Sequence, residues 1–197
     1  MEKKLQRIKK KVVECTKCEL SATRNNAVPG KGNYKSDVIF VGEAPGKNED
    51  TKGEPFIGVA GNKLSAALES AGISRDEVYI TNIVKCRPPK NRVPTTIERN
   101  TCQNYLKKEI EIIKPKIICV LGNTAFNSLL DGKEIIKFRG KIVRKNNQLY
   151  FLTIHPAATI YNQKLISVLK KDIKKLFKLI KKIKEGEKIK IDIEHAS

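Results

Sequence analysis

The sequence predicts an α/β domain built around a parallel sheet. Short apolar runs, typical of strands, alternate along the chain with longer segments whose apolar residues recur at helical spacing. The runs at 38–41 and 117–121 are apolar throughout, as expected for strands covered by helices on both faces. A length of 197 residues and a hydrophobic content of 40% suit one domain, residues 1–197, with a sizeable core.

The first half of the chain is predicted to form three helices and two strands. Leu5, Ile8 and Val12 lie on one helical face. Thr95 or Thr96 is expected to cap a later helix, with Glu98 placed for a capping box. Prolines keep the segment "RPPKNRVP" out of any helix. The predicted elements are a helix over 3–13, a strand over 37–42, a helix over 61–72, a strand over 77–86 and a helix over 96–113.

The second half continues the alternation. Asn146 and Asn147 suit a tight turn between two strands, and the last helix has an apolar face opposite a face of lysines. The predicted elements are a strand over 116–122, a short helix over 123–130, two strands within 141–156 and a helix over 162–184. The tail from about residue 186 is expected to fray.

The charge of the chain favours a polyanionic partner. Lysine and arginine number 40 against 21 aspartates and glutamates, which gives a net charge of +19 at pH 7. Nucleic acid is the first candidate, an acidic membrane surface the second. A lysine-rich, thermophile-style surface is the alternative, although such surfaces usually balance lysine with glutamate. The sequence has no run of 18 apolar residues and no apolar signal segment near its start, so a membrane-spanning or secreted protein is not expected.

Four of the five cysteines have a spacing that suggests a metal centre. Cys15 and Cys18 form a C-x-x-C pair, and Cys86 and Cys102 follow much later. Four thiolates can hold either zinc or an iron–sulfur cluster, and four unrelated buried thiols are the alternative. A zinc ribbon usually repeats C-x-x-C in its second half, so the wide second pair favours a cluster. Cys119, inside an apolar strand, is expected to be buried as a small hydrophobic residue.

Three unusual segments follow predicted strands and should meet at one edge of the sheet. They are "GEAPG" at 42–46, "TNIVKC" at 81–86 and "TIHPAAT" at 153–159. In open α/β sheets the ligand binds beyond the carboxyl ends of the strands. The first segment is glycine-rich like a phosphate loop, but it has neither Gly-Lys-Ser/Thr nor the third glycine of a dinucleotide fingerprint. The site is therefore expected where these loops converge.

Together with the cysteines, these motifs resemble those of the family 4 uracil-DNA glycosylases, thermophile-type enzymes with a 4Fe-4S cluster. The matching motifs are the C-x-x-C pair, "GEAPG", "PF-G" at 55–58, "TNIVKCRPP" at 81–89, Cys102 and "HPAA" at 155–158. They cover the chain from Cys15 to the C-terminal helix. The resemblance implies a three-layer α/β/α sandwich with a central, mostly parallel sheet of four to five strands.

The resemblance also implies how a flipped uracil would be held. The backbone at Gly42, Glu43 and Ala44 would line the base, because glycine allows close approach. Phe56 would stack on it, although an ordinary core phenylalanine is nearly as good an interpretation. A carboxylate that matches Glu49 would block the methyl group of thymine.

Two further residues would recognise the base and support catalysis. The amide of Asn82 can donate to uracil O4 and accept from N3–H. His155 would donate to O2 and stabilise the uracil anion as the glycosidic bond breaks. Better-known uracil glycosylases have aspartate where this chain has Ala44. Either Glu43 assists the attacking water, or cleavage runs ahead through an oxocarbenium-like state; both routes stay open, and the second is favoured.

The remaining expectations concern the cluster, DNA and cellular context. Cys15, Cys18, Cys86 and Cys102 would hold the 4Fe-4S cluster in a structural role. The residues expected at phosphates are Arg87, Lys90, Arg92 and Arg99, and those expected as minor-groove wedges are Ile160 and Tyr161.

The expected protein is a monofunctional, monomeric, cytoplasmic and nucleoid-associated enzyme that starts base excision repair. It would act on double- or single-stranded DNA containing uracil and would not bind a membrane; a sliding-clamp partner stays open. One alternative is a non-catalytic iron–sulfur protein that binds nucleic acid or transfers electrons. The other is a zinc-ribbon protein with an unrelated hydrolase site.

Overall fold

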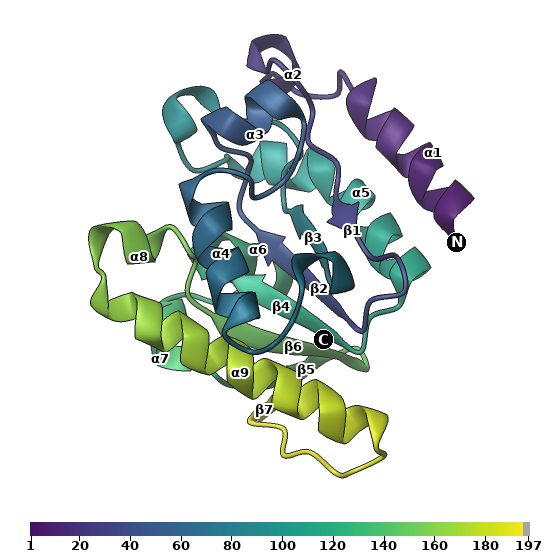
Figure 1. Ribbon diagram of the computed structural model, residues 1–197. Coiled ribbons are helices and arrows are strands. Elements are labelled where there is room, and N and C mark those ends of the chain that lie inside the picture. The colour runs from purple at the N-terminus through teal and green to yellow at the C-terminus, as the bar shows by residue number, and fades with distance from the viewer. Residues whose placement is uncertain (195–197) are drawn as a thin grey trace.

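A seven-stranded sheet runs through the middle of the computed structural model, which describes residues 1–194 (Figure 1). Its strands are β1 (Lys31–Gly32), β2 (Val38–Gly42), β3 (Tyr79–Asn82), β4 (Ile117–Leu121), β5 (Ile142–Lys145), β6 (Gln148–Thr153) and β7 (Ile193–Glu194), in the order β1-β3-β2-β4-β6-β5-β7. The four central strands, β3, β2, β4 and β6, are parallel to one another. The antiparallel pairs β1–β3 and β5–β6 flank them.

Helices cover both faces of this sheet. The α-helices are α1 (Glu2–Val13), α2 (Leu20–Thr23), α3 (Lys47–Lys52), α4 (Val59–Glu69), α5 (Thr96–Ile113), α6 (Gly122–Leu130), α7 (Ile135–Phe138), α8 (Ala158–Tyr161) and α9 (Lys164–Lys184). Two short 3₁₀ helices are η1 (Arg75–Glu77) and η2 (Pro89–Asn91). No helix within residues 1–194 is both long and apolar enough to cross a membrane.

Successive side chains of each strand point to opposite faces of the sheet, so the core divides into two clusters, one under each layer of helices. Ile39 and Val41 of β2 belong to the core cluster under α1, α5 and α6, whereas Val38 and Phe40 belong to the cluster under α4 and α9. Every residue of β2 and β4 is buried, so these strands contribute side chains to both clusters. The predicted three-layer α/β/α fold is confirmed. Cys119 is fully buried in the second cluster, as expected.

The sheet has more strands than the four to five expected. The five longer strands lie at the predicted positions, and the two additions, β1 and β7, have two residues each. β7 corrects the expectation of a frayed tail. Ile189 and Ile191 pack against the core, Asp192 accepts a hydrogen bond from the Ile142 N–H, and Ile193–Glu194 pairs with β5. Alternating isoleucines give this segment the pattern of a strand; residues 195–197 of the predicted tail lie outside the described part.

α3 replaces part of the loop predicted after β2. Its sequence, KNEDTK, is polar throughout and has no apolar periodicity, so only its ends mark it as a helix. Gly46 is the N-cap, and the Glu49 carboxylate accepts the Gly46 N–H. Gly53 ends the helix at φ +72, a left-handed conformation that glycine adopts without strain. The helix fixes the direction in which the chain leaves the strand.

Candidate active site

The three segments expected to converge do meet, at the carboxyl ends of β2, β3 and β6. They surround a cavity of about 510 Å³. Its lining includes the predicted site residues Glu43, Ala44, Glu49, Phe56, Asn82 and His155. The cavity is large enough for a flipped base together with its sugar.

Asn82, the last residue of β3, lies at the floor of the cavity. Its side chain is 1% exposed, and its amide oxygen has no hydrogen-bond partner among the described residues. A buried acceptor without a partner is costly and marks a place where a ligand donor would bind. Gly42 lies behind it: a Cβ there would come within 2.6 Å of this oxygen and 2.5 Å of the Phe56 ring. Gly42 thus lets both side chains approach the strand end, rather than lining the cavity itself.

Phe56 and His155 form the aromatic part of the floor. Their ring centroids are 5.7 Å apart, and the planes are tilted by 37°. Phe56 is buried and has φ +52, a left-handed conformation that is unfavourable for a bulky residue. Strain of this kind is commonly found at functional sites.

The environment of His155 fixes its protonation. Burial lowers its pKa to about 4, and the negative charge of Glu49 opposes this only partly, so the imidazole is neutral at pH 7. Its Nδ1 accepts a hydrogen bond from the Ala157 N–H at 3.2 Å. An accepting Nδ1 leaves the proton on Nε2, which makes Nε2 a donor. His155 therefore carries a neutral hydrogen-bond donor.

Two residues that support this site were not predicted. Gly122, directly after β4, has φ +87, and a Cβ there would come within 2.7 Å of the His155 Cβ. Thr124 donates a 2.5 Å hydrogen bond to a carboxylate oxygen of Glu43. Gly122 comes directly after the buried strand β4, and Gly42 is the last residue of the buried strand β2, so a glycine stands at the carboxyl end of both strands. This glycine at the end of an apolar strand is the feature of the sequence that could have pointed to Gly122 and Thr124.

Glu49 holds the loops that frame the cavity. One of its oxygens accepts from the Ile57 and Gly58 N–H groups at 2.9 and 2.7 Å, and the other accepts from Gly46 at 3.1 Å. These bonds join the start of α3 to the segment after Phe56. The structure thus gives Glu49 a positioning role in addition to its place in the cavity lining.

Exposed apolar residues surround the mouth of the cavity. Tyr161 is 91% exposed and Ile160 43%, and both contribute to the lining from α8. Val59, at the start of α4, is a third exposed apolar residue in the lining, and no motif in the sequence pointed to it. Exposed apolar groups at the mouth of a polar cavity suit contact with a partner surface.

The predicted phosphate contacts differ in their surroundings. Arg92 lines the cavity and pairs with the Glu98 carboxylate through both terminal nitrogens, at 2.9 and 2.6 Å. This pairing holds the pKa of Glu98 at about 2. Arg87 donates through Nε to Asn91, a cavity residue, at 2.7 Å. Arg92 is thus held by α5, and Arg87 by η2.

The other two basic residues of that region are placed differently. Lys90 is exposed in η2. Arg99 is turned into the protein, where it donates to Asn127 at 2.8 Å and to Ser128 at 3.3 Å. Its neighbours give Arg99 a structural role, and it does not line the cavity.

The four predicted metal ligands come from segments far apart in the sequence. Cys86 and Cys102 belong to the core cluster under α1 and α5, and Cys15 and Cys18 pack against the same cluster. None of the four forms a disulfide. Two sulfurs accept hydrogen bonds: Cys86 from Arg24 at 2.9 Å, and Cys102 from the Lys85 N–H at 3.3 Å.

The chemistry of this donor set suits soft metal ions. Burial raises the pKa of Cys86 and raises that of Cys102 to about 12, and charges on neighbouring cysteines add to both shifts. A metal bound at these thiols would be needed to keep them as thiolates at pH 7. No group of three or more ligating side chains within residues 1–194 has the arrangement that a single metal ion requires. Four cysteine thiols are nevertheless the kind of donor that an iron–sulfur cluster requires.

Sequence comparisons establish the family. The profile of the uracil DNA glycosylase superfamily matches residues 29–181. The type-4 uracil-DNA glycosylase of Sulfurisphaera tokodaii is 45% identical over 185 residues, which cover 89% of this chain and 84% of that protein. The type-4 enzyme of Archaeoglobus fulgidus is 43% identical, with 87% and 91% covered, and that of Saccharolobus solfataricus is 46% identical, with 84% and 81% covered. The chain therefore belongs to the uracil-DNA glycosylase superfamily and, within it, to the type-4 enzymes.

Proposed function

We propose that the protein flips deoxyuridine out of DNA and hydrolyses its N-glycosidic bond, releasing uracil and leaving an abasic site that starts base excision repair. The observation that carries this proposal is the unpartnered amide oxygen of Asn82 at the floor of the cavity. Phe56 and His155 lie beside it with an aromatic face and a neutral donor. The family relationship supports the same substrate.

Uracil supplies the partners that Asn82 lacks. Its N3–H would donate to the amide oxygen, and its O4 would accept from the amide nitrogen. Cytosine offers the opposite pattern, an acceptor at N3 and a donor at N4, so it would leave buried groups unpaired. Phe56 would stack on the base, and the side chain of Glu49 would exclude the methyl group of thymine.

His155 would act on the leaving group. As the glycosidic bond breaks, negative charge develops on uracil, including O2, and a fixed donor at that point stabilises the transition state more than the bound substrate. A neutral imidazole suits this role because the bond from Ala157 fixes its proton on Nε2. The histidine donates without giving up its proton.

Water attack is the second part of the reaction. The side chain of Ala44 has no polar group that could hold a water molecule, whereas the Glu43 carboxylate lies in the cavity and is oriented by Thr124. We infer that bond cleavage runs ahead of water attack. Glu43 would then orient the water and stabilise positive charge on the sugar, and stabilisation of the leaving group would be the larger effect.

The four cysteines would hold a 4Fe-4S cluster in a structural role. Cys86 and Cys102 bracket the segment that carries Arg87 and Arg92, so a cluster there would hold this basic loop against α1 and α5. We propose DNA contacts for Arg87 and Arg92, with Ile160 and Tyr161 as wedges at the mouth.

Incubation with a uracil-containing oligonucleotide, followed by alkali, tests the reaction. Strand cleavage at the uracil position and release of free uracil are expected, and matched oligonucleotides with thymine or cytosine should stay intact. An Asn82→Ala variant purified in parallel controls for contaminating glycosylases. Binding of DNA without any excision would instead support the non-catalytic alternative.

The metal content tests the cluster. The purified protein should be brown and contain about four irons per chain, and Cys102→Ser should lose the colour. Cys119→Ser is the matched control, because Cys119 lies in the opposite core cluster and should not affect iron content. A colourless protein with one bound zinc would contradict the cluster.

A further inference from the structure

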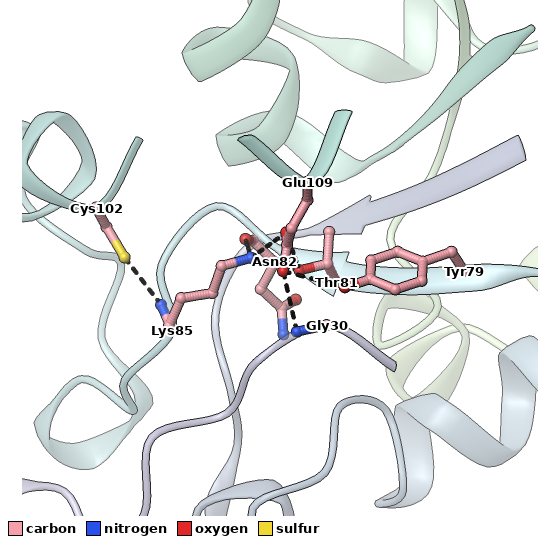
Figure 2. A network of polar contacts seen from close by, with 7 residues as sticks. All are labelled: Gly30, Tyr79, Thr81, Asn82, Lys85, Cys102 and Glu109. Carbon is pink, nitrogen blue, oxygen red and sulfur yellow. Dashed lines mark hydrogen bonds and ion pairs between the residues drawn. The ribbon is translucent and has the colours of Figure 1, made fainter. Parts of the chain in front are cut away.

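A buried ion pair lies directly beneath the strand end that carries Asn82. Lys85 and Glu109 are each 1% exposed, and the Lys85 ammonium is 2.7 Å from one carboxylate oxygen of Glu109 (Figure 2). The same ammonium donates to the hydroxyl of Thr81 and, at 3.0 Å, to the backbone carbonyl of Asn82. All three N–H groups of the lysine are thus used.

Glu109, from α5, is equally well bonded. One oxygen accepts from the Thr81 hydroxyl at 3.0 Å in addition to the lysine. The other accepts from the Gly30 N–H at 3.1 Å and from the Tyr79 hydroxyl at 3.3 Å. Burial and the Glu109 carboxylate raise the pKa of Tyr79, so the phenol stays protonated and donates.

This network connects three parts of the chain around one peptide group. Thr81 and Asn82 end β3, Glu109 belongs to α5, and Lys85 turns back from the following segment (Figure 2). The backbone N–H of Lys85 also donates to the Cys102 sulfur. Lys85 thus lies between the cysteines and the end of β3. Its backbone N–H bonds Cys102, and its ammonium bonds the carbonyl of Asn82.

Stability alone does not explain such a pair. A buried ion pair loses hydration on both charges, and well-packed apolar residues often stabilise a protein as well or better. What the pair contributes is geometry: a tetrahedral ammonium bonded to three fixed oxygens allows one position for the Asn82 carbonyl. The side chain of Asn82 has no bond through its own amide oxygen, so its direction depends on the backbone that carries it.

We propose that Lys85 and Glu109 are positioning residues that hold Asn82 for recognition of the uracil edge. The inference rests on the proposed function. Lys85 donates to the carbonyl of Asn82, and Glu109 holds Lys85 from α5. The two residues do not line the cavity and act on the base only through Asn82.

The test uses a double variant that removes both charges together, Lys85→Met with Glu109→Gln. The glutamine keeps an acceptor for Gly30 and Tyr79, while the Asn82 carbonyl loses its ammonium donor. Affinity is measured for a duplex with a non-cleavable 2′-fluorinated deoxyuridine and for the same duplex with an abasic analogue. We expect the uracil duplex to bind at least about tenfold more weakly, as for one lost bidentate contact, and the abasic duplex to change less than about twofold.

Two further variants separate positioning from general destabilisation. Tyr79→Phe removes a hydroxyl that donates to Glu109 and does not bond Lys85 or Asn82, and it should lower the unfolding midpoint without changing the preference for uracil. In an Asn82→Ala background the double variant should cause no further loss, because coupled residues act through one group. If the double variant does not fold, Lys85→Arg replaces it. A planar guanidinium keeps the charge but cannot reach the three oxygens as the ammonium does, so the same loss is expected.

Two results would overturn the positioning role: an unchanged preference for the uracil duplex in a folded variant, or an undiminished loss in the Asn82→Ala background. Failure of the proposed function is recognised separately. In that case the wild type neither releases uracil nor binds the fluorinated duplex better than a thymidine duplex.

Discussion

The floor and the mouth of the cavity are built in opposite ways. At the floor, Asn82 is 1% exposed and Phe56 5%, and glycines let the surrounding backbone pack against them. At the mouth, Tyr161 is 91% exposed and the Arg92 side chain 42%. The floor is fixed by burial and by bonds to backbone, whereas α8 at the mouth is a single turn.

This difference separates two tasks of a base-removing enzyme. Recognition of a small planar base needs donors and acceptors fixed in advance, because each misplaced group weakens discrimination. Engagement of DNA needs exposed charge and apolar wedges that work only when the duplex arrives. Substitutions at the floor should therefore change chemistry and base choice, and those at the mouth should change binding to DNA.

The largest effect is expected at His155. His155→Ala removes the donor to the developing charge on uracil, and the single-turnover rate should fall by roughly 10²–10³-fold. Affinity for a duplex with non-cleavable deoxyuridine should change far less, since the charge appears only late in the reaction. A loss of binding as large as the loss of rate would make His155 a structural residue.

Asn82→Asp comes next. A carboxylate repels uracil O4, so excision should fall at least about tenfold, the loss expected from one bidentate contact. Slight activity on cytosine could arise through the N4 donor, if a proton is available for N3. Single-turnover assays on matched uracil and cytosine oligonucleotides measure both. Asn62→Asp adds the same charge on α4, outside the cavity lining, and should keep uracil excision; full activity in Asn82→Asp would show that the loop backbone reads the base.

The fold and the floor follow from local patterns in the sequence. Buried parallel strands must end at one edge, so the order of the strands and motifs was enough to predict that Asn82 and His155 meet. Their supports could not be predicted in this way. Lys85 and Glu109 are 24 residues apart and join only through tertiary packing, and lysine and glutamate are usually exposed. α3 was missed because a polar helix without apolar periodicity resembles a loop.

Tyr161 is the most exposed apolar residue at the mouth and one of the two proposed wedges, and its removal should affect duplex DNA more than single strands. Tyr161→Ala should slow excision from duplex DNA by roughly three- to tenfold, because a wedge offsets part of the unstacking cost. Single-stranded substrate, which needs less unstacking, should be affected less than about twofold. Ile136→Ala is the matched control, since Ile136 is exposed on α7 and does not line the cavity. Equal losses on both substrates would remove the wedge role.

A smaller effect is expected from the arginines at the mouth. Arg87→Ala and Arg92→Ala should each lower the salt dependence of duplex binding by about one charge. Between about 50 and 200 mM salt, this corresponds to roughly a threefold change in relative affinity. Lys182→Ala, near the far end of α9, is the control and should leave the slope unchanged. An unchanged slope in both arginine variants would place the DNA face elsewhere.

The smallest effect concerns pH and distinguishes the floor most sharply from the mouth. The pKa of His155 is lowered to about 4, so about 3% of the imidazole is protonated at pH 5.5. The single-turnover rate at saturating enzyme should therefore change less than about twofold between pH 8 and 5.5. Below this range protonation gives Nδ1 a hydrogen that opposes the Ala157 N–H, and activity should fall as the pH approaches 4. A histidine with an ordinary pKa would instead produce an inflection near 6.5. Such an inflection, absent from His155→Ala, would show that His155 works in its charged form and that the floor is not a dry, preset site.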